Sequence, residues 1–381
     1  MERTIFSQHH DDFRAMIRTF LEGAVVPVFP EWLDAKLVPR DFFYQLGKLG
    51  VLGMNIPEEY GGSGAAGYLF SVVLHEEVAR AMVHLGPLRC HLDVVMPYFL
   101  EYSNAEQRRR WLPKCATGEM LTAIAMTEPE TGSDLGGIRT VAVRDGDSYI
   151  LTGAKTFITG GIHADAVIVV ARTADTPNRR DGLSLIVVED GMPGFAKGAN
   201  LAKVGLAVQD TAELAFDHVR VPVSNLLGRE GEAFRYLMHN LAGERLGVAL
   251  NAVSSAQAAL DVTLDYVNNR RVFGKTLNTF QNTKFELASV ATEVAAGQAM
   301  FDAAAVAHDE RRLDPVDAAK VKLFCSELQT RVVDRCLQLF GGYGYMMEYP
   351  IARLFTDARV TRIYGGTSEV MKTIISKSLG L

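Results

Sequence analysis

The sequence is poor in cysteine and in blocks of basic residues, and it contains no long apolar run. Its four cysteines (Cys90, Cys115, Cys325 and Cys336) form no CxxC pair, so we expect reduced thiols and no metal site. Lys and Arg number 39 against 45 Asp and Glu, a net charge of −6, which disfavours nucleic acid and anionic membranes as partners. No stretch approaches the roughly 18 apolar residues of a transmembrane helix.

The first residues also lack the pattern of a secretory signal. Met1 to Asp12 is a polar stretch that includes Glu2 and Asp11, whereas a signal needs a basic start and an apolar core. We therefore expect a cytoplasmic protein, or one in an organelle such as the mitochondrial matrix if a transit peptide has been removed.

Hydrophobic periodicity divides the chain into three parts. From Ser7 to about Glu119 apolar residues recur at helical spacing, and the first helix should end before Pro27 and Pro30. From Leu121 to about Val223 the period becomes two, with Gly, Asp and Asn turns between short runs. The β-rich runs are 149–151, 166–170 and 183–188. Short strands without intervening helices predict an antiparallel barrel or sandwich.

Helical periodicity returns after about residue 230. Long helices are predicted near 232–268, 280–311 and 315–340. We therefore predict an α+β fold in three domains. These are an N-terminal helical domain over residues 1–120, a central β-domain over 121–225, and a C-terminal helical bundle over 226–381.

Three polar segments are candidate ligand sites. Thr127–Asp134 offers hydroxyls and glycine-exposed amides, which suit a polar ring edge or a phosphate, although an ordinary turn explains it more simply. Phe157–Gly161 places an aromatic ring and a hydroxyl at a strand end, compatible with a flavin or with a plain strand end. In Arg270–Lys275, shortly before Gln281, the arginines suit a pyrophosphate or simply complement a helix dipole.

Two glycine-rich segments follow. Gln338–Tyr345 contains GGxG, but a predicted helix precedes it where a dinucleotide-binding Rossmann loop needs a strand, so a nicotinamide cofactor is disfavoured. Close approach of this backbone to another ligand remains open. In Ile363–Glu369, Thr367 or Ser368 can cap the next helix, whose free amides can also bind an anion.

Glu244 is the most informative single residue. It lies on the apolar stripe of a predicted helix, between Leu241 and Val248. A carboxylate in that position should be desolvated, which raises its pKa and suits a general base. A buried ion pair, for example with Arg245, would also explain it.

Four segments together resemble the acyl-CoA dehydrogenase family: MTEPETGSD, RRVFGK, LFGGYGYMMEYPIARLFTDARV and IYGGTSE, in this order. The resemblance runs from about Ile5 to Ile375. It implies an N-terminal helical domain, a central β-domain and a C-terminal four-helix bundle. It further implies FAD as cofactor, acyl-CoA as substrate, an electron-transferring flavoprotein as electron acceptor, and a homotetramer built as a pair of dimers.

The resemblance also implies site residues. The subunit's own flavin would contact Met126, Thr127, Gly132, Ser133, Phe157, Thr159, Thr367 and Glu369. A tryptophan is common in the family at the Phe157 position, so the stacking surface here is smaller. The FAD of the neighbouring subunit would contact Arg270, Phe273, Gln281, Gln338, Gly341 and Gly342. The substrate would contact Ser133, Arg245, Tyr364, Gly365 and Gly366.

One position departs from the usual family pattern. Many members carry the catalytic glutamate where this chain has Gly365, which cannot remove a proton. The long-chain and isovaleryl branches instead place it on the helix before the RRVFGK-like motif, directly ahead of an arginine, and Glu244-Arg245 matches that position. The resemblance therefore favours Glu244 as the base, and IYGGTSEVMK, AIAMTEPETGSD and QDTAELAF are most similar to the long-chain branch.

The expected reaction is α,β-dehydrogenation of a medium- to long-chain or branched acyl-CoA to the trans-2-enoyl-CoA. Glu244 would take the α-proton, and the β-hydride would pass to the flavin N5. Two other functions on this scaffold stay open at this point: a flavin oxidase or monooxygenase, and a non-catalytic acyl-CoA-binding subunit.

Overall fold

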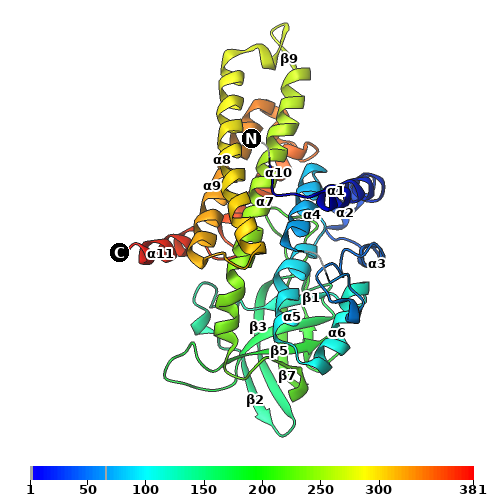
Figure 1. The fold of residues 1–381 in the computed structure, drawn as a ribbon, viewed down its shortest axis with the longest axis vertical. Helices are drawn as coiled ribbons and strands as arrows, with labels where there is room; N and C mark the ends of the chain where they lie inside the picture. The colour runs from blue at the N-terminus through cyan, green and yellow to red at the C-terminus, as the bar shows by residue number, and fades with distance from the viewer. Residues whose placement is uncertain (1–2, 65–66) are drawn as a thin grey trace.

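The computed structural model describes residues 3–64 and 67–381 (Figure 1). Its N-terminal helices begin and end at clear signals. Asn104 caps α6 through a reciprocal capping box with Gln107, and Gly118 ends that helix in the left-handed conformation at φ 81°. The N-terminal helices are α1 (Gln8–Phe20), the π-helical η1 (Leu21–Val25), α2 (Phe29–Ala35), α3 (Arg40–Lys48), α4 (Tyr68–Arg80), the π-helical η3 (Cys90–Val95), α5 (Met96–Tyr102) and α6 (Ala105–Thr117).

The first helical segment ends at Val25, before Pro27, as predicted. Pro30, by contrast, does not break a helix but lies in the first turn of α2, where no backbone N–H is needed. Short 3₁₀ turns connect several elements: η2 (Glu58–Tyr60), η4 (Leu135–Gly137), η5 (Val223–Asn225), η6 (Leu277–Thr279), η7 (Gly341–Tyr345) and η8 (Arg359–Arg362).

The central part of the chain forms one eight-stranded sheet with the strand order β6-β7-β3-β2-β4-β5-β8, and β1 pairs beside β4. Its strands are β1 (Thr122–Ala125), β2 (Val141–Asp145), β3 (Ser148–Thr159), β4 (Ala166–Arg172), β5 (Leu183–Glu189), β6 (Phe195–Lys197), β7 (Thr211–Pro222) and β8 (Leu226–Leu227). A two-residue pair, β9 (Arg271–Val272) and β10 (Lys275–Thr276), forms a separate hairpin.

The predicted fold class is confirmed, with one correction to the strand pairing. The sheet is mixed rather than purely antiparallel, because β1 pairs parallel with β4 and Val141 of β2 pairs parallel with Arg172. The long excursion between β1 and β4, which contains the β2–β3 hairpin, returns the chain in the direction that parallel pairing requires.

Both faces of the central strands β4 and β5 are buried, whereas β2 and β7 expose alternate residues. Ile168 and Val170 of β4 pack with Phe99 and Trp111 of the N-terminal helices, in one core cluster. The alternate residues of β4 face a second cluster, which β3 and β7 of the same sheet complete. The sheet therefore curls over its own core on one side and carries helices α5 and α6 on the other.

The C-terminal part contains the three predicted long helices within a few residues of their predicted limits: α7 (Ala233–Asn269), α8 (Gln281–Asp309) and α9 (Pro315–Phe340). A shorter fourth helix, α10 (Pro350–Ala358), packs against α7 and α9. The last helix, α11 (Ser368–Ser378), contacts α9, and its end projects away from the bundle (Figure 1). Helix α7 is the element that connects the regions, since it runs from the sheet to the β9–β10 hairpin (Figure 1).

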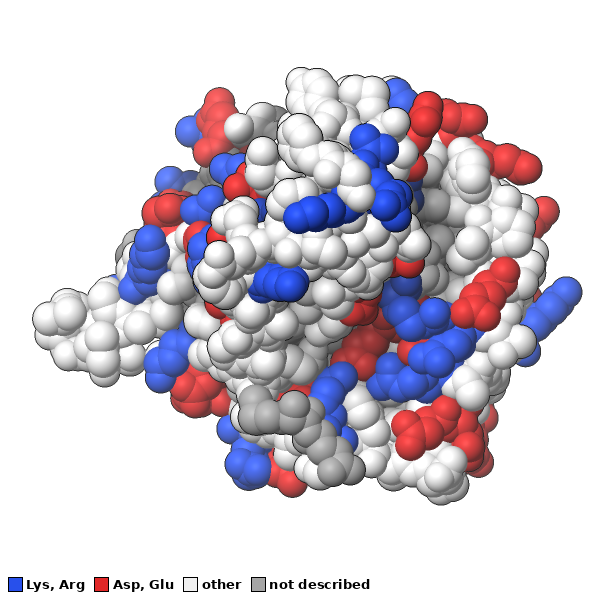
Figure 2. Space-filling view, turned by 90° about the horizontal axis from the view of Figure 1, so that it is seen from above, with Lys and Arg blue, Asp and Glu red and all other residues white. Residues whose placement is uncertain are grey.

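Charges of both signs are interspersed on the face seen from above, and both gather around a hollow beside the bundle (Figure 2). Within residues 3–64 and 67–381, no helix is long and apolar enough to cross a membrane.

A buried carboxylate joins α1 to α4. Glu77 is 1% exposed and accepts hydrogen bonds from three guanidinium groups, those of Arg14, Arg18 and Arg80. Burial alone would raise the pKa of Glu77, but the arginines outweigh it and lower the pKa to about 2.

We predict that Glu77→Gln lowers the free energy of unfolding by about 3 kcal/mol, because three arginines lose their shared anion. Since the folded-state pKa is about 2 and the ordinary value is 4.5, the contribution is present above 4.5 and is lost as the pH falls towards 2. Thermal melting between pH 7 and pH 3 measures both effects. Glu22→Gln is the control, because the exposed Glu22 pairs with a single arginine, Arg80, among the described residues. Equal losses in the two variants would contradict this account.

Candidate active site

Glu244 lies on α7 among buried apolar residues of the same helix face. Leu237 and Val248 are at most 1% exposed, and Leu241 is 9% exposed. Burial raises the pKa of the Glu244 carboxyl above its ordinary value of 4.5, as the stripe predicted. Three cations oppose that shift, in the order Arg89, Arg245 and Lys322. The site therefore holds a carboxylate that is both desolvated and surrounded by positive charge.

The loop Tyr364-Gly365-Gly366 faces this carboxylate. Gly365 has φ 64° and Gly366 has φ 97°, conformations that side chains rarely adopt. A Cβ atom built on Gly365 would lie 3.9 Å from Oε1 of Glu244 and 3.1 Å from Cγ2 of Val248. The side-chain position of residue 365 and the carboxylate of Glu244 are therefore neighbours in space, although they lie on separate elements.

Lys322 of α9 holds this loop. Its side chain is 0% exposed, and Nζ donates a 2.6 Å hydrogen bond to the carbonyl of Gly366. Burial and the nearby Arg245 lower the pKa of Lys322 to about 8, against the opposing effect of Glu244. Glycine is favoured at position 366 because its backbone has φ 97°, which other residues rarely adopt.

The predicted flavin contacts of the β-domain lie on two neighbouring segments. The backbone N–H of Thr156 donates to the carbonyl of Thr127 at 2.9 Å, which joins the segment after β1 to β3. Lys155 is buried between these segments, where it donates to the carbonyl of Met126 at 3.1 Å and to Glu128 at 2.9 Å. Burial lowers the pKa of Lys155 to about 8, although Glu128 raises it in part.

The surfaces of these two segments fit a flat ring. Phe157 is 68% exposed at φ 58°, so its ring is presented outward rather than packed in the core. Gly132 and Ser133 are exposed, and a Cβ on Gly132 would approach nothing closer than 4.0 Å. Thr159 is half-buried, and its carbonyl accepts from the thiol of Cys90 at 3.9 Å.

Thr367 caps α11, as predicted, by accepting a hydrogen bond from the backbone N–H of Val370 at 3.3 Å. Glu369 is exposed in the first turn of that helix. A hydrogen bond from its own backbone N–H, followed by one from Thr367, lowers its pKa.

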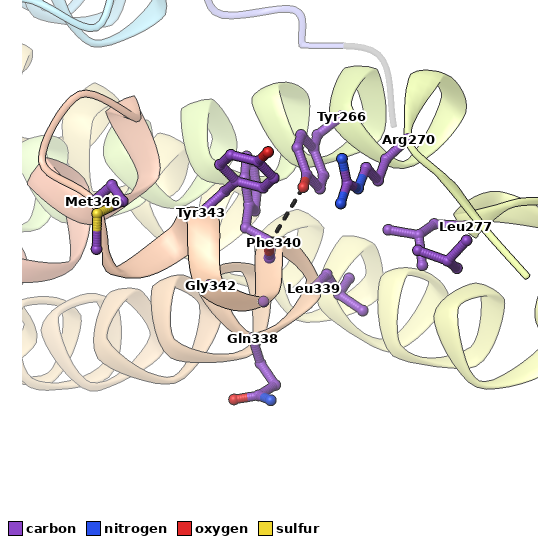
Figure 3. Close-up of a pocket in the computed structure, with 11 residues that line it drawn as sticks. Tyr266, Arg270, Leu277, Gln338, Leu339, Phe340, Gly342, Tyr343 and Met346 are labelled. Atoms are coloured by element: carbon purple, nitrogen blue, oxygen red, sulfur yellow. Dashed lines mark hydrogen bonds between the residues drawn. The ribbon is translucent and has the colours of Figure 1, made fainter.

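A second group of predicted residues gathers at the other end of α7, around a pocket of about 530 Å³ (Figure 3). Arg270 lies 4.9 Å from the ring of Tyr343, and Tyr266 stacks on Phe340 at 4.0 Å. Of the six residues that the resemblance assigned to the neighbouring subunit's FAD, this pocket brings together Arg270, Gln338, Gly341 and Gly342. Figure 3 shows the Gln338 side chain pointing away from the aromatic rings.

Phe273 and Gln281 do not line this pocket. Phe273 is 94% exposed at the tip of the β9–β10 hairpin, with φ 49°, and Gln281 is exposed at the start of α8. Arg270 follows Glu244 by 26 positions on one helix, a distance of about 39 Å at the helical rise. The residues around Glu244 and the residues around Arg270 are therefore two separate clusters within one chain.

Comparisons with known proteins agree with this geometry. The N-terminal, middle and C-terminal domain profiles of acyl-CoA dehydrogenase match residues 7–119, 123–219 and 231–380. The chain belongs to the acyl-CoA dehydrogenase family. The mitochondrial long-chain specific acyl-CoA dehydrogenase of Sus scrofa is 44% identical over 378 residues, covering 99% of this chain and 88% of that protein.

Solved structures of the family share the fold of this chain over nearly its whole length. The acyl-CoA dehydrogenase of Geobacillus kaustophilus shares 44% identity and a TM-score of 0.97, with 100% of both chains covered. A glutaryl-CoA dehydrogenase of Mycobacterium smegmatis in complex with FADH2 shares 29% identity and a TM-score of 0.89, covering 98% of this chain and 95% of that one. This chain is accordingly an FAD-dependent oxidoreductase of the acyl-CoA dehydrogenase type.

Three basic residues at the site were not singled out from the sequence: Arg89, Lys155 and Lys322. A signal for Lys322 does exist, because it shares a buried helix face with Ala318, Cys325 and Gln329, at spacings of three and four. This is the same signal that identified Glu244. Arg89 and Lys155 lie in segments where no single periodicity marks them.

We predict that Lys322→Met lowers kcat by about tenfold or more, because the Gly365–Gly366 loop loses a charged hydrogen bond. Removing this cation should also raise the pKa of Glu244 further, so the acidic limb of the pH–rate profile should move to higher pH. A merely structural role for Lys322 would not move that limb.

The matched control is Lys320→Met, since Lys320 is exposed on the same helix and forms an ion pair with the exposed Asp317. FAD content and melting temperature should be compared for both variants. An unchanged pH profile in Lys322→Met would contradict its electrostatic coupling to Glu244.

Proposed function

We propose that this protein oxidises an acyl-CoA to the trans-2-enoyl-CoA with Glu244 as the base that removes the α-proton. The observation that carries the proposal is the 3.9 Å approach between Oε1 of Glu244 and the Cβ position of Gly365. In the family, the catalytic glutamate stands at the position of either Glu244 or Gly365. Side chains at these two positions therefore reach the same point of the site.

The surrounding residues suit this role. The raised pKa of Glu244 makes it a stronger base than an exposed glutamate, while Arg89, Arg245 and Lys322 keep its charged form accessible. The backbone N–H of Gly365 is available to donate to the thioester oxygen, where negative charge develops as the α-proton leaves. Lys322 fixes that loop through the carbonyl of Gly366. Arg245 and Tyr364 would contact the substrate beside the base.

We propose that FAD binds across two copies of the chain. Met126, Thr127, Gly132, Ser133, Phe157, Thr159, Thr367 and Glu369 would hold the flavin side. Arg270, Phe273, Gln281, Gln338, Gly341 and Gly342 of another copy would hold the remainder. The distance of about 39 Å along α7 between Glu244, which lies beside the loop before Thr367, and Arg270 supports contributions from two copies. The family resemblance further suggests a homotetramer built as paired dimers. When bound, FAD supplies the acceptor for the β-hydride.

The electron acceptor we propose is an electron-transferring flavoprotein. The similarity to the long-chain enzyme favours a medium- to long-chain or branched acyl group without fixing its length. We propose domain limits near residues 120 and 225, supported by the change from α6 to β1 and, a few residues after 225, by the change from β8 to α7.

We predict that Glu244→Gln lowers kcat by roughly 100- to 10,000-fold, the usual contribution of a general base, while FAD content stays normal. Anaerobic bleaching of the flavin by a series of acyl-CoAs is the measurement. Glu232→Gln, which changes a half-buried glutamate at the N-cap position of the same helix that pairs with Arg235, is the control. Near-normal bleaching by Glu244→Gln would disprove the assignment.

The unmodified protein distinguishes two alternative functions. Rapid reoxidation by air with peroxide formation would indicate an oxidase, and tight acyl-CoA binding without bleaching would indicate a non-catalytic subunit.

A second prediction moves the base. In the Glu244→Gln background, Gly365→Glu should restore part of the activity, because its Cβ would lie beside the lost carboxylate. The recovery should be larger when Val248→Ala is added, since Cγ2 of Val248 lies 3.1 Å from that Cβ. The left-handed backbone at residue 365 limits the recovery in both cases. Equal activity with and without Val248→Ala would show that this contact is not the obstacle.

A further inference from the structure

Lys155 is a buried cation on the inner side of the two segments proposed to meet the flavin. Its side chain is 1% exposed, and Nζ donates to the carbonyl of Met126 at 3.1 Å and to Oε1 of Glu128 at 2.9 Å. Two residues further along β3, Phe157 is 68% exposed. In a regular strand residues 155 and 157 would lie on the same face, so the chain must depart from regular geometry between them.

The departure is a β-bulge in β3. Lys155 pairs with Leu214 of β7, and Ile158 pairs with Ala212, so three steps along β3 match two steps along β7. Phe157 lies in this bulge with φ 58°. A bulge changes the direction of the side chains around it, and bulges are frequent next to active sites. Here the bulge turns the lysine inward and the phenylalanine outward.

The contact with Lys155 fixes the peptide unit between Met126 and Thr127. This unit is trans, since no cis peptide bond occurs within residues 3–64 and 67–381. In a planar trans peptide the C=O and N–H groups point in opposite directions. Because the carbonyl of Met126 points to Lys155, the N–H of Thr127 must point away from it. The following carbonyl is also held, since that of Thr127 accepts from the N–H of Thr156 at 2.9 Å.

The N–H of Thr127 is left without a partner by this arrangement. It forms no hydrogen bond within the described residues, although the next N–H, that of Glu128, donates to the carbonyl of Thr131 at 2.8 Å. Thr127 is half-buried, and the segment after it exposes Gly132 and Ser133. A backbone N–H without a protein partner is normally satisfied by water or by a ligand. The donor therefore belongs to the segment for which we propose flavin contacts.

Glu128 holds Lys155 in one place. Its carboxylate also accepts from the backbone N–H groups of Arg139 at 2.7 Å and Thr140 at 2.9 Å. Burial alone would raise the pKa of Glu128, but Lys155 and these N–H groups lower it, so the carboxyl is charged at neutral pH. A lysine paired with an anion that is itself fixed has little freedom, and the carbonyl of Met126 is thereby kept in one orientation.

We propose that Lys155 is a positioning residue for the flavin, because it aims the N–H of Thr127 at the polar edge of the ring. The proposal rests on the proposed function for the placement of FAD. The carbonyl oxygens and N1 of a flavin gain negative charge on reduction, so a donor fixed beside them in advance stabilises the reduced form. Lys155 would thus raise the reduction potential of bound FAD without contacting the cofactor.

The test compares reduction potentials at constant net charge. The Lys155–Glu128 pair is neutral as a whole, so Lys155→Met combined with Glu128→Gln removes the hydrogen bond to Met126 without changing the charge of the site. The potential is measured by equilibration with a reference dye, which needs no acyl-CoA. We expect a lower potential than in the unmodified protein, and FAD that dissociates roughly three- to tenfold more readily on dilution. Glu128→Gln alone keeps the lysine and should retain most of the original potential.

Lys197 provides a matched control in the same domain. It is half-buried on β6, donates to the carbonyl of Ala164 at 2.7 Å and pairs with Asp190 at 2.9 Å, but it is not among the residues beside the proposed flavin position. Lys197→Met combined with Asp190→Asn should leave the potential unchanged. Equal shifts in the two double variants would overturn the proposal. So would a lower melting temperature with an unchanged potential in the Lys155 variant, since that result shows a structural role only.

Hydrogen exchange gives a second measurement that does not depend on a variant that folds. In the unmodified, FAD-loaded protein the amide of Thr127 should exchange slowly, and more slowly still after the flavin is reduced with dithionite, because its acceptor gains negative charge. Fast exchange of this amide in both redox states would overturn the proposal.

Failure of this proposal can be distinguished from failure of the proposed function. The dye and dithionite reduce FAD directly, so both measurements decide the role of Lys155 even if no acyl-CoA bleaches the flavin. Normal bleaching by acyl-CoA together with an unchanged potential in Lys155→Met/Glu128→Gln would reject the role of Lys155 and leave the dehydrogenase function in place.

Discussion

The desolvated carboxylate of Glu244 is the constraint on which the rest of the site depends. It lies on a helix face made of leucine and valine, where an isolated charge would be expelled or neutralised. Arg89, Arg245 and Lys322 surround it closely enough to offset part of that cost. Of these cations, Lys322 also holds a loop of the site, because its Nζ donates a hydrogen bond to the carbonyl of Gly366.

Two buried lysines in different parts of the fold each hold a loop by a hydrogen bond to a backbone carbonyl. Lys155 in the sheet donates to the carbonyl of Met126, and Lys322 in the helical bundle donates to the carbonyl of Gly366. Burial lowers the pKa of both to about 8, so both are mostly charged at neutral pH. A charged donor fixes a loop carbonyl more firmly than a neutral one does. The backbone on each side of the proposed substrate position is thereby held rigid without adding a side chain to the space between.

The sequence predicted the long helices, the β-rich centre and the inward carboxylate, because each follows from a local period. It could not predict the parallel pairing of β1 with β4, since that depends on how a long excursion returns. It also missed Arg89, whose approach to Gly247 on α7 is not a property of its neighbours in sequence. Residue types in one segment report periodicity, whereas the pairing of buried charges is decided by contacts between distant segments.

The relation between residues 244 and 365 shows what this scaffold requires. A base must reach the substrate from one point in space, and that point is adjacent both to α7 and to the loop after η8. In the proposed mechanism the loop has a second role, because its backbone N–H would donate to the thioester oxygen, and this role needs no side chain. With the carboxylate on α7, residue 365 is released to be a glycine and to adopt φ 64°. In this arrangement α7 positions the carboxylate of Glu244, and the loop contributes only the backbone N–H of residue 365.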